Sequence, residues 1–247
     1  MACGGRSDLF QDGPFENEDT KDVCRTLISG TWFKTKTLVE ERYNHHAWLS
    51  PLGIILFSGD SSEFVDSFGG QSSEGFSLRY DLEGYCSIQL EDKVIMTSGS
   101  RALAYNQDGW IRSENYPPMN HQRTHHGCGH YINSDNVLVL LVTGGYNGLW
   151  VTVSTTEILV TGSDSWKEVG NLPVPMLSPK GVSIENKVIM TGGGAKFGLF
   201  QHDAVTSVLS FNITDEQWYF IGDMNKKRVF HGISSVQVES IIDQLNC

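Results

Sequence analysis

The residues best suited to chemistry in this chain are concentrated between positions 121 and 130. The stretch holds four histidines and one cysteine: His121, His125, His126, Cys128 and His130. Imidazole and thiolate groups are ligands that zinc and copper accept in proteins, so a metal site is one hypothesis. We favour a packing role instead, because Arg123 and His126 belong to a pattern that recurs along the chain. His121, His125 and His130 have no counterpart in that pattern, so a true site would have to involve them.

The sequence contains none of the compact patterns that mark common enzyme classes. It has no Gly-Xaa-Ser-Xaa-Gly nucleophile elbow, no phosphate-binding glycine loop and no His-Glu-Xaa-Xaa-His metal pair. We therefore expect a protein that is not an enzyme and that needs no cofactor.

The pattern that contains Arg123 and His126 is Arg-Xaa-Xaa-His, which also occurs at positions 42–45 and 228–231. Two further stretches fill the same slots with other residues: Glu83 and Cys86 in one, and Leu177 and Lys180 in the other. The recurrence indicates that these residues are positioned by repeated structural elements, with the last two repeats degenerate.

A longer repeated segment shows the repeat directly. The segment 88–99 returns at 182–193 with seven of its twelve residues identical, and a shorter copy lies halfway between them at 139–145. The period is therefore about 47 residues, which is typical of propeller blades or solenoid turns. Each copy is an apolar, β-branched run that ends on glycine, so it predicts a buried strand followed by a backbone conformation that side chains with a Cβ resist.

Each repeat carries the same sequence of signals. The glycines that end the runs are Gly5, Gly59, Gly99, Gly145 and Gly193. An aromatic residue follows each of them: Trp32, Phe76, Trp110, Trp166 and Trp218. Several repeats place a strand with Glu or Tyr between glycine and aromatic, which gives four strands per repeat. Because the tryptophans recur in register, we expect them to pack between neighbouring repeats rather than to bind a ligand.

Diglycine, a Glu or Tyr strand, Trp and then Arg-Xaa-Xaa-His is the order of the kelch repeat, and the chain resembles that family over its whole length. The likeness is strongest to invertebrate extracellular kelch-like proteins, through sequence segments such as residues 37–42 and 126–129 and the C-terminal Cys247. The resemblance implies an all-β fold: a kelch-type β-propeller of about five four-stranded blades, either an incomplete ring or a closed one.

We expect one domain spanning 1–247, with repeat units of roughly 1–45, 46–86, 87–126, 127–180 and 181–247. The chain opens within a unit and its last strand, near 239–243, lacks the glycine ending. We therefore expect a five-blade ring whose ends are in contact. The same observation leaves a missing upstream blade or leader as the alternative.

The resemblance implies a non-catalytic scaffold that binds a protein, or a glycan, through its loops, since binding residues collect in loops on rigid scaffolds. The longest and least repetitive segments follow Gly145 and Gly193, and they contain the candidate partner-binding residues: Tyr146, Trp150, Phe197, Phe200 and His202. One alternative is a galactose oxidase-like copper-radical enzyme, which needs a Tyr cross-linked to Cys and a further Tyr with two His. The other is an intracellular adaptor propeller.

Charge and hydropathy exclude two classes of partner. The chain has 18 Lys and Arg against 29 Asp and Glu, a net charge of −11. Phosphate backbones are repelled by such a surface, so nucleic acid is not expected to bind. No apolar run approaches the roughly 20 residues of a membrane-spanning helix.

The sequence leaves the compartment open. Two features favour an extracellular location: Cys3 and Cys24 lie where a disulfide could join them, and Asn212 begins an Asn-Ile-Thr glycosylation sequon at an expected turn. Against export, the N-terminus shows no apolar core of a signal peptide.

Overall fold

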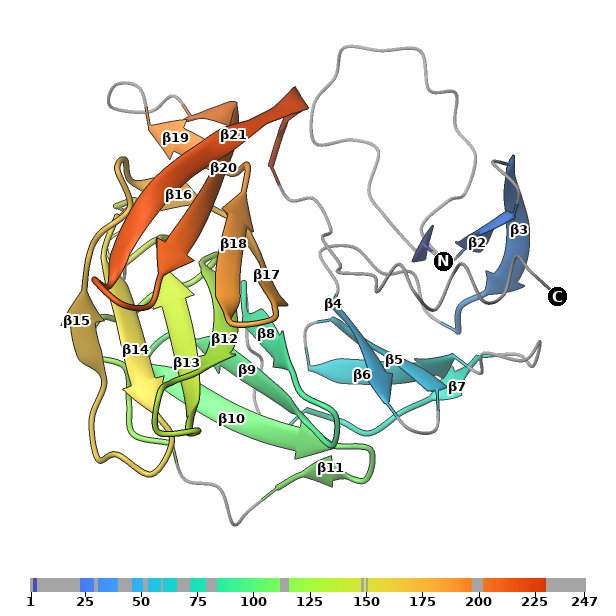
Figure 1. The fold of residues 1–247 in the computed structure, drawn as a ribbon. Coiled ribbons are helices and arrows are strands. Elements are labelled where there is room, and N and C mark those ends of the chain that lie inside the picture. The colour runs from blue at the N-terminus through green and yellow to red at the C-terminus, as the bar shows by residue number, and fades with distance from the viewer. Residues whose placement is uncertain are drawn as a thin grey trace, which may run out of the picture. The chain divides into compact units, whose positions relative to one another are not determined.

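The structure is a computed structural model of the 247-residue chain (Figure 1). It describes residues 2–3, 23–28, 31–39, 46–50, 53–58, 60–65, 72–78, 84–111, 116–147, 149, 151–196 and 202–229. Every regular element in these ranges is a β-strand, so the expected all-β class is confirmed. The chain divides into two compact units, residues 1–116 and 117–247, and each is described by itself.

The first unit contains three antiparallel sheets. The N-terminal sheet has strands β1 (Ala2–Cys3), β2 (Val23–Ile28) and β3 (Thr31–Thr37). The second has β4 (His46–Ser50), β5 (Gly53–Ser58), β6 (Ser61–Val65) and β7 (Ser73–Glu74). The third has β8 (Cys86–Gln89), β9 (Val94–Ser98), β10 (Arg101–Asn106) and β11 (Gly109–Trp110). In all three, each strand pairs with the next along the chain.

The second unit contains two sheets. One has strands β12 (Gly127–Ile132), β13 (Leu138–Thr143), β14 (Thr156–Val160) and β15 (Lys167–Val169), again paired in chain order. The other has six: β16 (Met176–Leu177), β17 (Lys180–Ile184), β18 (Lys187–Thr191), β19 (Gly194–Lys196), β20 (His202–Asn212) and β21 (Gln217–Arg228). There β20 pairs with both β18 and β19, and β21 covers its other edge.

Three of the five sheets, β4–β7, β8–β11 and β12–β15, have the four strands in chain order that each repeat predicted, whereas the N-terminal sheet has three described strands and the last sheet has six. Within the first unit, neighbouring sheets meet through their first strands, β4 and β8. In the second unit β12 lies against β17 and β18 (Figure 1). In both units the contact involves strands at the edge of their sheets, β4 with β8 and β12 with β17, which is how propeller blades meet around an axis. The closure of the ring depends on the placement of the two units and on residues outside the described ranges, so it stays a prediction.

The tryptophans that recur in register are largely buried. Trp166 and Trp218 are 3% and 7% exposed. Trp218 lies on β21, and its indole N–H donates to the hydroxyl of Thr156 on β14, 2.9 Å away in the neighbouring sheet. Trp110 is partly buried against the core of the first unit, whereas the side chain of Trp32 lies outside the described residues. The expectation that these rings pack between repeats is confirmed where a described ring joins two sheets.

The diglycines have the backbone conformation that the repeat predicted. Gly145 and Gly193 have φ of 91° and 104°. A Cβ on Gly145 would lie 2.5 Å from the carbonyl oxygen of Thr124, and one on Gly193 would lie 2.9 Å from that of Leu177. Both strain and close approach therefore require glycine at these strand ends.

Candidate functional site

A fully buried ion pair organises the second unit. The guanidinium of Arg123 donates to the Glu157 carboxylate at 2.6 Å, and both side chains have no exposed surface. Arg123 also donates to the carbonyl oxygens of Gly144 and Thr155, at 3.1 and 2.8 Å. Burial lowers the pKa of Arg123 and the charge of Glu157 opposes that shift, so the arginine remains a cation. The pair joins the segment before β12 to the ends of β13 and β14.

Glu157 also fixes the backbone that precedes Arg123. Its carboxylate accepts from the backbone N–H groups of Asn120 and His121, at 2.7 and 3.1 Å. The side-chain amide of Asn120 donates to the carbonyl oxygen of Trp166. The segment 120–122 is thus held in one position by groups in the core, although its side chains reach the surface.

The loop between β13 and β14 carries a tight turn at Asn147, Leu149 and Val151 that we call the Asn147 turn. The side-chain oxygen of Asn147 accepts from the backbone N–H groups of Leu149 and Val151, at 2.9 and 3.0 Å. Asparagine closes such turns readily because its side chain mimics a backbone carbonyl. The turn presents the Leu149 side chain to solvent, with 81% of its surface exposed.

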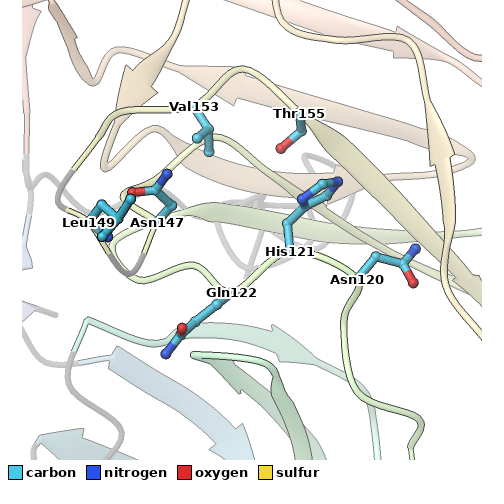
Figure 2. Close-up of a pocket in the computed structure, with 7 residues that line it drawn as sticks. All are labelled: Asn120, His121, Gln122, Asn147, Leu149, Val153 and Thr155. Atoms are coloured by element: carbon cyan, nitrogen blue, oxygen red, sulfur yellow. The ribbon is translucent and has the colours of Figure 1, made fainter.

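A pocket of about 430 Å³ lies between the segment 120–122 and the loop that contains the Asn147 turn. It is lined by Asn120, His121, Gln122, Asn147, Leu149, Val153 and Thr155. Figure 2 shows His121 and Thr155 pointing toward one another, with Asn147, Leu149 and Val153 along another wall. The Gln122 side chain points away from these five, so Gln122 contributes mainly the part nearest its backbone.

Polar groups stand on two walls of the pocket. Nε2 of His121 lies 2.5 Å from a carboxylate oxygen of Glu168, which leaves Nδ1 of the ring to contact a ligand. The oxygen of the Asn147 side chain is occupied by its turn, which leaves its amide N–H groups as donors. Two hydrogen-bonding groups, the Asn147 amide and the His121 ring, therefore flank the apolar surface of Leu149 and Val153.

No model of a known protein family matches the sequence, and no curated protein matches it. Among solved structures, the "Structure of YjhT" is similar, with a TM-score of 0.60 and 12% sequence identity over 78% of this chain and 73% of that chain. The fold is that of a β-propeller. At this level of identity the likeness concerns the fold alone.

The pocket occupies loops that a propeller offers for binding. One wall precedes the first strand of the β12–β15 blade, and the other lies between the second and third strands of the same blade. Both are anchored to the blade by Glu157 and Arg123. The site is thus a surface feature of one rigid blade, which is where recognition residues are expected on such a scaffold.

The propeller separates the histidines that are adjacent in the sequence. His126 is buried, and burial holds its pKa well below the usual range, with the charge of Arg123 adding to the effect. The His125 ring packs edge-on to Tyr146, with 6.3 Å between centroids, and burial lowers the pKa of His130 on β12. Of the three histidines that have no counterpart in the repeat, His121 alone lines the pocket. Among the described residues, no three His, Cys, Asp or Glu side chains are grouped as a metal site.

Of the predicted partner-binding residues, the structure describes Tyr146 fully. Its backbone N–H donates to the carbonyl oxygen of Thr124 at 2.8 Å, and it immediately precedes the Asn147 turn. His202 begins β20 opposite Lys196. Trp150, Phe197 and Phe200 lie outside the described residues, so their role stays a prediction.

The structure adds Asn147, Leu149 and Val153 to the residues that the sequence singled out. The available signal was Asn147 followed by Gly148, a turn-forming pair directly after the diglycine strand.

The cysteines are used more widely than the sequence indicated. Cys86 and Cys128 are both disulfide-bonded. The predicted pair, Cys3 and Cys24, lies directly opposite in the β1–β2 ladder, and opposed residues in antiparallel strands have the Cα separation of roughly 4.5–5.5 Å that a disulfide spans. That bond stays a prediction.

No helix among the described residues is long and apolar enough to cross a bilayer.

Proposed function

We propose that this chain is a kelch-repeat propeller without catalytic activity that binds a protein partner through the pocket beside the Asn147 turn. The observation that carries the proposal is the exposed Leu149 at the edge of that pocket, on a turn in which the Asn147 side-chain oxygen accepts from the backbone N–H groups of Leu149 and Val151. A backbone held by such hydrogen bonds presents its side chain for binding at a lower entropic cost than a mobile loop does. The exposure of Leu149 is consistent with a recognition role.

The polar groups favour an extended peptide as the ligand. The N–H donors of Asn147 suit a peptide carbonyl, and Nδ1 of His121 is a second hydrogen-bonding group for the peptide backbone. Leu149 and Val153 would pack against an apolar side chain of the same peptide. Because the chain carries a net charge of −11, the partner segment is neutral or basic rather than acidic.

The disulfides bear on the two alternatives. A copper-radical oxidase needs a free cysteine for its cross-link to tyrosine, and two of the five cysteines, Cys86 and Cys128, are disulfide-bonded and so not available for it. An intracellular adaptor would work in a reducing compartment, where disulfides are rare. Both observations favour an extracellular binding protein, in line with the resemblance to extracellular kelch-like proteins.

A peptide selection tests the proposal. Peptides are selected from a random display library on the full chain, and the dissociation constants of the enriched peptides are then measured. We expect enrichment of neutral or basic peptides with an apolar residue, and a loss of at least about tenfold in affinity, or about 1.4 kcal/mol, in Leu149→Asp. Ile184→Asp is the matched control, because Ile184 is also exposed in the second unit, at 41%, but does not line the pocket.

Two outcomes would contradict the proposal: selection that yields no peptide, or peptides that bind both aspartate variants equally well. If the chain instead binds a glycan on an array saturably, and Leu149→Asp abolishes that binding, the pocket is a sugar-binding site.

A further inference from the structure

The turn between β20 and β21 presents the sequon of the chain in an ordered, accessible form. Asn212 ends β20 and Thr214 follows it in the turn, and both residues are exposed. The backbone N–H of Thr214 donates to the side-chain oxygen of Asn212 at 2.9 Å. No other Asn-Xaa-Ser or Asn-Xaa-Thr occurs in the sequence.

This hydrogen bond prepares the Asn212 amide for reaction. A donor on the amide oxygen stabilises the negative charge that develops there as the amide nitrogen loses a proton. The nitrogen thereby becomes a better nucleophile. Exposure of the residue leaves the nitrogen accessible to an enzyme.

We propose that Asn212 carries an N-linked glycan. The donor is a lipid-linked oligosaccharide diphosphate. The bond from the first sugar's anomeric carbon to phosphate breaks, and a bond from that carbon to Nδ2 of Asn212 forms. The lipid diphosphate leaves with the bonding electrons, and the amide proton passes to the transferase. No oxidation or reduction is involved.

The disulfide-bonded Cys86 and Cys128 are an independent reason to expect this modification. Disulfides form and persist in the secretory compartments of a eukaryotic cell, which are also where this sequon is recognised. A chain that acquires these bonds on its way out of the cell exposes Asn212 to the transferase.

The surface beside the sequon explains what the glycan does. Tyr219, Phe220 and Ile221 on β21 are exposed at 49%, 60% and 55%. Among the described residues, β21 pairs with β20 alone, and an apolar strand edge of this kind promotes association between molecules. Asn212 pairs with Gln217, two positions before Tyr219, so Tyr219 and the glycan lie on the same face of the hairpin. The glycan therefore shields the apolar outer strand.

The test uses the full chain secreted from a eukaryotic host through an added signal peptide. Intact mass is measured before and after peptide-N-glycosidase treatment, which converts a glycosylated Asn212 to Asp. We expect a glycan on the wild type and on Thr214→Ser, which preserves the sequon. We expect none on Thr214→Ala, which removes the sequon but keeps the backbone N–H that bonds Asn212. Thr214→Ala should also aggregate at a lower protein concentration than Thr214→Ser.

The proposal is overturned if Asn212 is unmodified in secreted wild-type protein in which Cys86 and Cys128 are shown to be oxidised. A glycan of equal occupancy on Thr214→Ala would also overturn it. If Thr214→Ala is not secreted, the conversion of residue 212 to Asp when the wild type is treated with the glycosidase still decides whether that residue is modified.

Discussion

The carboxylates of Glu157 and Glu63 occupy equivalent positions in two blades and bind equivalent backbone groups. Glu157 accepts from the N–H of Asn120 at 2.7 Å, and Glu63 accepts from the N–H of Val39 at 2.6 Å. Asn120 lies three residues before Arg123, and Val39 lies three residues before Arg42. The repeat therefore preserves a buried polar contact as well as a sequence pattern.

We expect Glu157→Gln to lower the free energy of unfolding by about 3–5 kcal/mol, because it leaves Arg123 buried without its counter-ion. Urea denaturation of the purified variant measures the loss. The double variant Arg123→Leu with Glu157→Leu should recover part of it, since the last blade places the buried Leu177 and Leu209 in the same two slots. A single variant as stable as the wild type would contradict the role given to the pair.

Arg42 lies outside the described residues, and the repeat predicts that it pairs with Glu63. A double-mutant cycle with Arg42→Met and Glu63→Gln should give a coupling energy between about 0.5 and 3 kcal/mol. Additive effects of the two substitutions on the free energy of unfolding would show that the pair does not form.

Gly145→Val should destabilise the propeller through two effects, backbone strain of about 1–3 kcal/mol and collision with the Thr124 carbonyl. Gly162→Val separates them, because Gly162 has a φ of 92° but nothing within 4 Å of an added Cβ. The melting temperature should therefore fall further for Gly145→Val than for Gly162→Val. Equal decreases in melting temperature would show that the close approach of the Thr124 carbonyl contributes nothing.

Stability should decline as the pH falls below about 6.5, the ordinary pKa of histidine. Burial holds the pKa of His126 below that value in the folded state, so in this range the unfolded chain binds a proton that the folded chain does not. The contribution of neutral His126 to the free energy of unfolding is complete above pH 6.5. It is lost progressively below that pH, with a slope of at most about 1.4 kcal/mol per pH unit. Burial of His130 acts in the same direction.

Urea denaturation at pH 7.5 and pH 5.5 measures the difference for the wild type and for His126→Gln. The variant should lose less stability on acidification than the wild type. An identical loss in both would mean that His126 does not titrate on unfolding.

The repeat predicted the blades because strand period, terminal glycine and buried tryptophan are local signals that recur at fixed spacing. It also placed Arg123 and His126 in packing roles, and both are buried. The pocket could not be predicted in this way, because it is formed by residues that the repeat does not constrain. His121 reaches it only because Glu157, a residue of another strand, fixes the backbone before Arg123.

The exposure of Leu149 also could not be predicted from the sequence. In the sequence it is one apolar residue in a loop, and its exposure depends on the hydrogen bonds that Asn147 makes to the following backbone. The disulfides of Cys86 and Cys128 were missed for a related reason, because pairing depends on distances in the folded chain and not on spacing in the sequence.

The affinity of a selected peptide for Asn147→Asp tests the proposed binding site most directly. Aspartate keeps the oxygen that closes the turn on Leu149 and Val151 but removes the N–H donors that face the ligand. Asn133→Asp is the control, because Asn133 closes an equivalent turn through the N–H groups of Asp135 and Val137, at 3.0 and 2.9 Å, and changes the net charge equally. We predict that calorimetric titration gives a dissociation constant about tenfold higher for Asn147→Asp, or about 1.4 kcal/mol, and an unchanged one for Asn133→Asp. Equal dissociation constants for the wild type and both variants would contradict peptide recognition at this pocket.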